Sequence, residues 1–417
     1  MKPGYKQTEV GVIPEEWSIR PLGLICDVRD GTHESPRFFK DGIPFVTSKN
    51  IVDGRLDLEN VSFISKSDAF EFDKRSKVDR NDILLSMIGT IGSAVLVDCE
   101  PAFCIKNVAL IKPRKVAPTY LIRLINAPVF QKYLADNLDG GIQKFISLGK
   151  LRQLFIPLPD EAEQRAIATA LSDVDGLLGG LDRLIAKKRD LKQAAMQQLL
   201  TSQTRLPGFH GEWEVKRLGD VITHCFSGAT PRRNRPEFYK GNIRWITSGE
   251  LNYNVITNTI EKISTEAVAE TNLTIHPVGT FLMAITGLEA EGTRGACGIV
   301  GAPSTTNQSC MAVFPTAALA GEYLFHYYVF RGKFLALQYC QGTKQQSYTA
   351  SLVKQLPIDL PPTLPEQTAI AEVLTEMDGE LAVLEQRREK TRALKQAMMQ
   401  ELLTGRIRLV ASSGATE

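Results

Sequence analysis

The sequence lacks any long apolar run. No stretch of its 417 residues approaches the roughly 18 consecutive apolar residues that a membrane-spanning helix needs. The first residues have no apolar core, so we expect no secretion signal. The seven cysteines are scattered and form no CxxC pair, which indicates free thiols in a reducing cytoplasm rather than a disulfide framework.

Catalytic motifs are missing as well. The chain has no GxxxxGK(S/T) phosphate loop and no HExxH or CxxC metal-binding pattern. Leu360-Pro-Pro-Thr363 lacks the flanking residues expected of an S-adenosylmethionine-dependent DNA adenine methyltransferase, and Gly89-Thr-Ile-Gly92 is typical of a hairpin turn. The five histidines have no Cys or Asp within local reach that would complete a metal or nucleophile motif. We therefore expect no catalytic residue, no metal ligand and no cofactor bound by this chain.

The chain also lacks a large net charge of either sign. Lysine and arginine number 49 against 47 acidic residues, so the formal net charge is only +2. A protein whose whole surface binds nucleic acid is usually more basic. Any contact with DNA must therefore come from local patches.

What the chain does contain is a repeat of most of its length. Trp17 recurs 196 residues later as Trp213, and Gln164 recurs 203 residues later as Gln367. A nearly constant offset indicates a duplicated unit.

Residues 1–159 and 205–362 are typical of α+β domains. Short runs rich in β-branched and aromatic residues alternate there with Gly, Pro and Asp turns. Strands are predicted at Ile43–Thr47, Asp82–Ser86 and Ile243–Thr247, and helices at Tyr120–Leu134 and Glu322–Gln338.

Residues 160–204 and 363–405 are typical of long helices with a heptad seam. The seam residues are Ile167, Leu171, Val174, Leu178, Leu181 and Ile185 in the first helix, and Ile370, Leu374, Met377, Leu381 and Leu384 in the second. We expect Leu191 and Leu394 to reopen the stripe further on. The pattern favours pairing of the two helices, each about 60 Å long; the alternative is that each helix packs on its own domain.

Several motifs that occur twice in the same order resemble those of one family. They are Ile13-Pro-Glu-Glu-Trp17 with Leu22-Gly23, Ile43-Pro-Phe-Val-Thr-Ser48, Asn81-Asp-Ile-Leu-Leu-Ser86, Lys106-Asn107 and Pro157-Leu-Pro159 with Glu163-Gln164, together with their counterparts in the second copy, which lacks the Asp-Ile-Leu form and has a less regular glycine turn. Over nearly its whole length the chain resembles the DNA-specificity (S) subunit of a type I restriction-modification system.

The resemblance implies a fold of two tandem α+β target-recognition domains, residues 1–159 and 205–362. They are joined by two helical regions, 160–204 and 363–417 with the C-terminal tail, that form an antiparallel coiled coil. It implies that each domain reads one half of a bipartite double-stranded DNA target in the cytoplasm of a prokaryote. The helix pair then sets the spacer and docks two methyltransferase (M) subunits, through which restriction (R) subunits join. S-adenosylmethionine, ATP and Mg belong to those partners, and the S chain is not an enzyme.

Basic and amide residues on loops are the candidates for DNA contact, because Arg, Lys, Asn and Gln read base edges and bind phosphates. They are Arg37, Lys40, Lys49 and Lys144 with its neighbour Gln143 in the first domain, and Arg232, Arg233, Arg235, Lys240, Lys344 and Gln345 in the second. For each residue the alternative is a solvated surface charge.

Two other classes of function stay open on the residues alone. One is a single-chain modification enzyme, against which the missing motifs argue. The other is a scaffold whose duplicated modules bind proteins without reading DNA, which the low net charge slightly favours.

Overall fold

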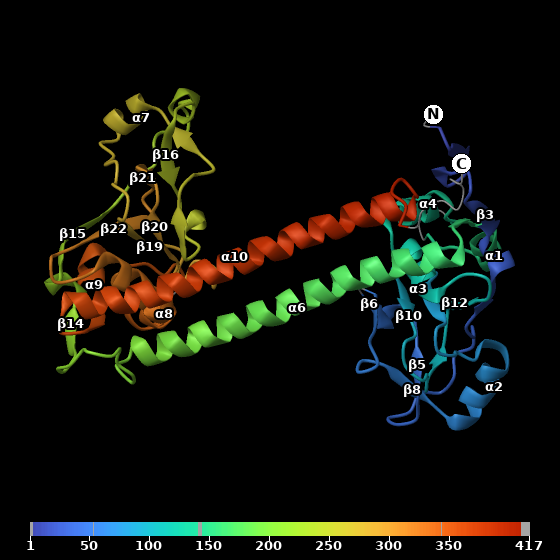
Figure 1. Cartoon of the computed structure of the whole chain (residues 1–417). Helices are drawn as coiled ribbons and strands as arrows, with labels where there is room; N and C mark the ends of the chain where they lie inside the picture. Colours follow the sequence, from blue (N-terminus) through green and yellow to red (C-terminus); the bar gives the residue numbers. More distant parts are fainter. Residues whose placement is uncertain (1–2, 53, 141–143, 343, 410–417) are drawn as a thin grey trace. The chain divides into compact units, whose positions relative to one another are not determined.

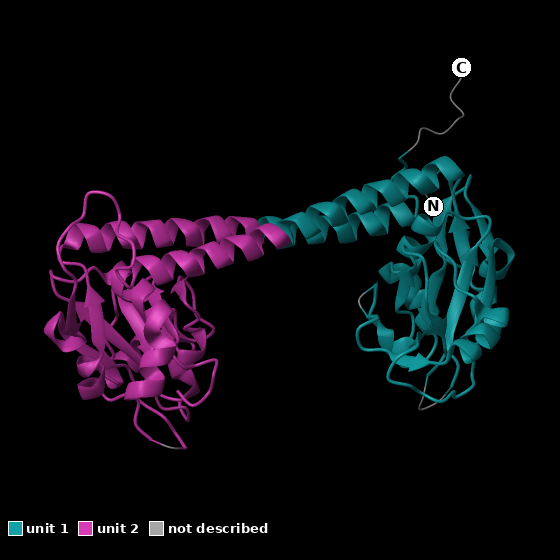
Figure 2. Ribbon diagram, turned by 90° about the horizontal axis from the view of Figure 1, so that it is seen from below, with its two compact units in different colours: residues 1–182, 386–417 teal, residues 183–385 magenta. Residues whose placement is uncertain are grey.

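The computed structural model describes residues 3–52, 54–140, 144–342 and 344–409. These residues form two compact units (Figure 2). Unit 1 combines Met1–Asp182 with Gln386–Glu417, and unit 2 is Arg183–Glu385. Each unit therefore contains parts of both sequence repeats. Among the described helices, none is long and apolar enough to cross a membrane.

Unit 1 is built on two small sheets. The four-stranded antiparallel sheet has the order β10 (Ala94–Leu96), β9 (Ile83–Ser86), β12 (Val108–Pro113) and β4 (Cys26–Asp30). The three-stranded sheet has the order β11 (Cys104–Ile105), β5 (Ile43–Val46) and β8 (Ser62–Ile64). The paired short strands are β1 (Tyr5–Thr8) with β2 (Gly11–Pro14), β3 (Ser18–Pro21) with β13 (Phe155–Leu158), and β6 (Ile51–Val52) with β7 (Arg55–Leu56). The helices are α1 (Leu22–Ile25), η1 (Ser48–Asn50), α2 (Lys66–Ser76), α3 (Pro118–Ile125), α4 (Pro128–Asp136) and α5 (Leu148–Gln153).

Unit 2 repeats the main sheet of unit 1 with one additional strand. Its five-stranded sheet has the order β15 (Ile222–Ser227), β22 (Cys310–Pro315), β19 (Phe281–Ala284), β20 (Cys297–Val300) and β17 (Asn254–Ile256). Its other strands are β18 (Lys262–Ile263), β16 (Ile243–Ile246) and β21 (Ser304–Thr306) in one sheet, and β14 (Glu214–Arg217) with β23 (Pro357–Leu360). The helices are η2 (Leu218–Asp220), η3 (Pro236–Tyr239), η4 (Ser248–Glu250), α7 (Thr265–Glu270), α8 (Gly321–Tyr339) and α9 (Ala350–Gln355).

The predicted strands are confirmed as β5, β9 and β16, and the predicted helix at 322–338 as α8. The prediction of one helix over Tyr120–Leu134 is wrong, because α3 ends at Ile125 and α4 begins at Pro128. Proline disfavours helical geometry in the residue before it, and it is well tolerated as the first residue of a helix.

Two long helices, α6 (Glu161–Leu199) and α10 (Leu364–Leu403), run antiparallel (Figure 1). Ion pairs between the two helices show that they are antiparallel. In unit 1 Lys395 lies 2.7 Å from Asp175, and in unit 2 Lys188 lies 2.5 Å from Glu380. Residue numbers thus fall along α10 as they rise along α6. The antiparallel helix pair between two α+β domains is the predicted fold class.

The seam residues pack in two ways. Ile167 and Leu171 are fully buried in the hydrophobic core of unit 1, together with Leu402 of α10. Ile370 and Leu374 are buried in the core of unit 2, together with Leu199 of α6. The start of each helix therefore packs on its own domain and on the end of the other helix, so both interpretations of the sequence hold in part.

The seam residues in the middle of the two helices are less completely buried. Leu181, Ile185 and Leu381 are buried, whereas Val174, Leu178, Met377 and Leu384 are partly buried. The expectation that Leu191 and Leu394 continue the stripe is wrong, because they are 47% and 55% exposed. Met196 and Met399 are buried instead.

Candidate nucleic-acid interface

A glycine fixes the start of the basic loop in each unit. A Cβ atom at Gly31 would collide with the carbonyl oxygen of Ile105, and one at Gly228 would collide with that of Thr306. Only glycine permits this close backbone approach. Both loops therefore leave their sheets from equivalent anchored positions.

In unit 1 the loop carries exposed aromatic and basic side chains. The Arg37 guanidinium lies 5.7 Å from the centre of the Phe39 ring, and Phe38 and Phe39 are 54% and 44% exposed. Lys40 and Lys49 are exposed too, and within the described residues none of the three cations has an acidic partner. Their charges are available for a phosphate or a base edge.

A polar cluster in unit 1 was missed by the sequence analysis. His33 Nε2 lies 2.8 Å from Asp30, and its Nδ1 lies 2.7 Å from the side-chain oxygen of Asn107. Arg75 forms an ion pair with the other oxygen of Asp30. Burial alone would raise the pKa of Asp30, but hydrogen bonds from His33 and Arg75 lower it below its ordinary value. Asp30, three residues before His33, was the signal in the sequence that could have indicated this cluster.

In unit 2 the three loop arginines are engaged internally. Arg233 binds both oxygens of Glu261 at 2.6 and 2.8 Å, and its guanidinium lies 4.3 Å from the centre of the Tyr239 ring. Arg235 and Arg232 converge on Glu270 at 2.7 and 3.6 Å.

These ion pairs hold the loop against the small aromatic core of unit 2, where Phe238 and Trp245 are buried. Arg235 stacks on Phe238 at 4.1 Å and also binds Glu237 and Glu266. Its charge is therefore compensated several times over. Arg232, with a side chain 72% exposed, is the most accessible of the three.

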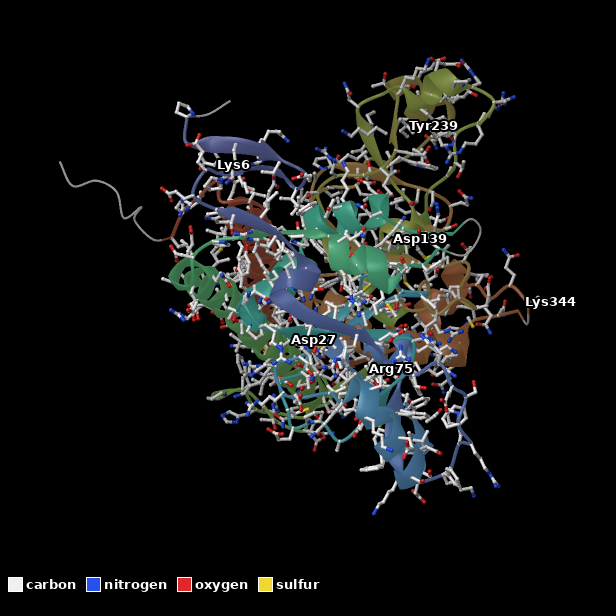
Figure 3. The ribbon with its side chains drawn as sticks, turned by 90° about the vertical axis from the view of Figure 1, so that its right-hand side faces the viewer. Lys6, Asp27, Arg75, Asp139, Tyr239 and Lys344 are labelled. Carbon is white, nitrogen blue, oxygen red and sulfur yellow. The ribbon has the colours of Figure 1, made fainter. Side chains whose placement is uncertain are left out.

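The remaining candidates lie on exposed loops. Lys144 precedes Phe145, which bridges to Ile88, while Gln143 lies outside the described residues. Lys344 and Gln345 lie just before Ser347, which bridges to Thr286, and Figure 3 shows Lys344 on a projecting loop. Lys240 is exposed as well.

A buried carboxylate joins each helix start to the chain segment that follows the other helix. Glu163 of α6 accepts hydrogen bonds from Trp17 at 2.9 Å and from Arg408 at 2.5 and 2.8 Å. Glu366 of α10 accepts bonds from Arg205 at 2.9 and 2.5 Å. Neither carboxylate is exposed.

The neighbouring glutamines have an equally structural role. Gln164 accepts a bond from the backbone N–H of Ala117 and donates to the carbonyl of Pro159, both at 2.9 Å. Gln367 accepts from Ala320 at 2.9 Å. The repeated Glu-Gln pair thus ties each helix to its own domain and to the far end of the other helix.

In the part of the chain that the structure describes, no group of three or more His, Cys, Asp or Glu side chains is placed to hold a metal ion.

The chain matches known proteins over most of its length. Residues 14–185 and 210–392 each match the family described as type I restriction modification DNA specificity domain. The MjaX type I restriction enzyme specificity subunit of Methanocaldococcus jannaschii is 26% identical over 436 residues, which cover 97% of each chain. The EcoBI specificity subunit of Escherichia coli is 30% identical over 209 residues, covering 46% of this chain and 44% of that one.

Solved structures agree on the fold. The S subunit of a type I restriction-modification system from M. genitalium superposes with a TM-score of 0.59 at 14% identity, covering 93% of this chain and 96% of that one. With two matched copies that together span most of its residues, the chain belongs to the family of type I restriction-modification DNA specificity domains.

Proposed function

We propose that this chain is the specificity subunit of a type I restriction-modification complex and that it selects DNA without catalysing a reaction. The observation that carries the proposal is the pair of specificity domains, each completed by the far end of the other repeat's helix. Such a chain presents two related but non-identical surfaces on one scaffold.

Each domain reads one half of a split double-stranded target. The exposed loops with Arg37, Lys40 and Lys49 in unit 1, and with Arg232 and Lys240 in unit 2, support this role through their charge and exposure. Phosphate contacts position such a reader, and contacts to base edges give the sequence preference.

The paired helices set the length of the unread spacer and dock two methyltransferase subunits. Restriction subunits join through that complex in the prokaryotic cytoplasm. S-adenosylmethionine, ATP and Mg act on those partners, which supply the methylation and restriction chemistry.

A domain exchange tests this assignment. Replacing residues 205–362 with the corresponding domain of a relative that reads another target should change one half of the methylated sequence. The other half and the gap should stay the same. If both halves changed together, the two domains would not be separate readers.

A protein-binding scaffold remains the second candidate, because one observation favours it. Arg233 and Arg235 lie in the densest basic segment but form ion pairs with glutamates of their own unit: Glu261, Glu237, Glu266 and Glu270. Their charges are therefore less available to DNA. A scaffold would dock partners but leave DNA methylation independent of this chain.

A further inference from the structure

The two units differ at one equivalent position on the helix pair. In unit 1, Arg123 of α3 donates to Asp175 Oδ2 and, at 3.2 Å, to the hydroxyl of Ser172. Lys395 of α10 binds the other oxygen, Asp175 Oδ1, at 2.7 Å. Both oxygens of this carboxylate are thus paired with cations from the same chain.

In unit 2 the arginine is replaced. The residues 203 positions later than Arg123, Ser172 and Asp175 are His326, Thr375 and Asp378. Lys192, the equivalent of Lys395, still binds Asp378 Oδ1. Within the described residues, no hydrogen bond reaches Asp378 Oδ2, so this carboxylate pairs with one cation where Asp175 pairs with two.

His326 does not substitute for the missing cation. Its Nε2 lies 2.8 Å from the hydroxyl of Thr375, and burial lowers its pKa to about 4, so the ring is neutral near pH 7. The side chain is only 2% exposed, yet its Nδ1 has no partner among the described residues. A buried polar atom without a partner costs free energy unless a ligand or water satisfies it.

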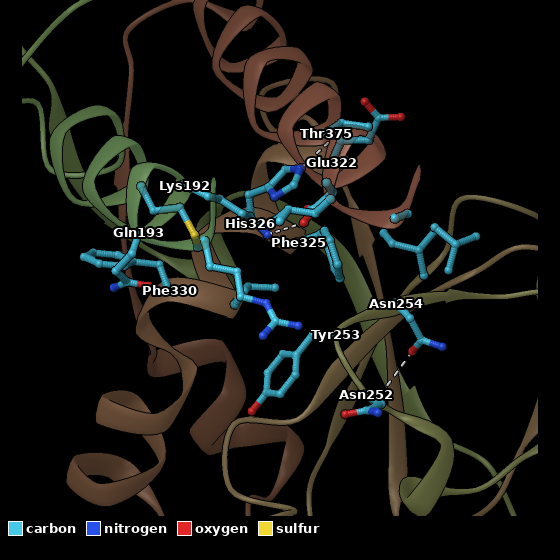
Figure 4. A pocket seen from close by; sticks show the side chains of 18 of the residues that line it. Lys192, Gln193, Asn252, Tyr253, Asn254, Glu322, Phe325, His326, Phe330 and Thr375 are labelled. Carbon is cyan, nitrogen blue, oxygen red and sulfur yellow. Dashed lines mark hydrogen bonds and ion pairs between the residues drawn. The ribbon is translucent and has the colours of Figure 1, made fainter. Parts of the chain in front are cut away.

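A cavity of about 860 Å³ opens at this position (Figure 4). Its walls combine Thr375 and Asp378 of α10 with aromatic side chains Phe325 and Phe330 of α8. Among its lining residues Arg189 pairs with Glu385 and Lys192 with Asp378, so the third acid, Glu322, gives the lining a net negative charge.

We infer that this cavity of unit 2 binds the guanidinium of an arginine side chain from a docked methyltransferase subunit, as Arg123 occupies the equivalent place in unit 1. A guanidinium fits better than an ammonium because its planar fork bonds a carboxylate and a nearby hydroxyl together and stacks on aromatic rings. The source is a protein partner because the walls include α6 and α10, the helices assigned to docking. The inference rests in this respect on the proposed function.

The first test uses a small probe and the whole chain. Titration with N-acetyl-arginine amide, followed by the NMR signals of the histidine rings, should shift His326 saturably. The isosteric but uncharged N-acetyl-citrulline amide should not. Asp378→Asn should weaken binding of the arginine probe at least about tenfold, the change that ~1.4 kcal/mol produces. Absence of saturable binding, or equal binding of both probes, would overturn the inference.

The second test addresses the partner. His326→Arg places an internal guanidinium in the cavity, as in unit 1, and should weaken binding of the methyltransferase subunit at least about tenfold. His326→Gln keeps the cavity open and serves as the matched control, and thermal unfolding checks that both variants fold. Unchanged affinity in His326→Arg would overturn the assignment to the partner subunit. A wild-type chain that binds no methyltransferase subunit would contradict the proposed function instead, while the probe titration would still decide whether the cavity binds guanidinium.

Discussion

At the scale of single residues, arginines and buried histidines determine much of the local structure. Sequence reasoning identified Arg232, Arg233 and Arg235 as a basic loop but could not predict that they bind glutamates of their own unit. Glu261 and Glu270 lie 28 and 35 residues from Arg233 and Arg235, so only the folded chain brings them together. The same holds for Arg408 and Glu163, which are 245 residues apart.

The loop arginines give the first prediction. Arg232→Ala together with Arg233→Ala should weaken DNA binding of the assembled complex and reduce the slope of log affinity against log salt by about 1, as expected for the loss of one phosphate contact from the exposed Arg232. Glu261→Gln is the matched control: it frees Arg233 and should leave binding unchanged or stronger. Binding titrations at several salt concentrations measure both, and an unchanged affinity and slope in the double variant would remove these residues from the interface.

The buried histidine gives the second prediction. The pKa of His326 falls from its ordinary 6.5 to about 4 in the folded chain because burial disfavours the charged ring. Between these values the unfolded chain binds more protons, so the free energy of unfolding should fall as the pH drops from 6.5 to 4. The loss should reach about 3 kcal/mol. His326→Gln should remove this share of the pH dependence in denaturant titrations, while His276, also shifted to about 4, retains its own share. Parallel pH profiles for wild type and variant would contradict the assignment.

At the scale of elements, heptad spacing predicted both long helices, and the repeat predicted that their starts are equivalent. The Pro-rich segments before Glu161 and Leu364 form the strands β13 and β23, which pair with β3 and β14. The break at Pro128 follows from proline's geometry and could have been predicted. The exposure of Leu191 could not have been predicted. A heptad pattern does not show where the two helices are joined by ion pairs, such as that of Lys192 with Asp378, instead of by apolar contacts.

The buried ion pair between Arg205 and Glu366, at the start of α10, gives the third prediction. Arg205→Met leaves the carboxylate of Glu366 buried without its cation and should destabilise unit 2 by about 3 kcal/mol in denaturant unfolding. The double variant Arg205→Met with Glu366→Gln removes the buried charge and should recover part of that loss. A single variant as stable as wild type would show that the ion pair contributes nothing to folding.

Helix length gives the fourth prediction, which rests on the proposed role of the helix pair. One heptad inserted in both helices, after Asp182 and after Glu385, adds about 10 Å to each. The spacer of the methylated target should lengthen by about three base pairs, with both half-sites unchanged. Mapping of methylated sites measures this, and an unchanged spacer would refute the idea that the helices set its length.

At the scale of the whole molecule, the duplication matters more than any single residue. The repeat was visible in the sequence, and so was the family it resembles. The exchange of helix ends between repeats was not, because it depends on the packing of Leu199 in one core with Ile370 and of Leu402 in the other core with Ile167, residues that lie in different repeats. This exchange keeps the framework of the two domains alike, while the sequences of their loops can differ.

The most direct test of the central claim is a genome-wide map of N6-methyladenine in a methylation-free host. The host would express a compatible methyltransferase subunit with or without this chain. The account predicts a split motif with a fixed gap that is methylated only when this chain is present. Methylation that is independent of the chain, or a continuous motif without a gap, would contradict it.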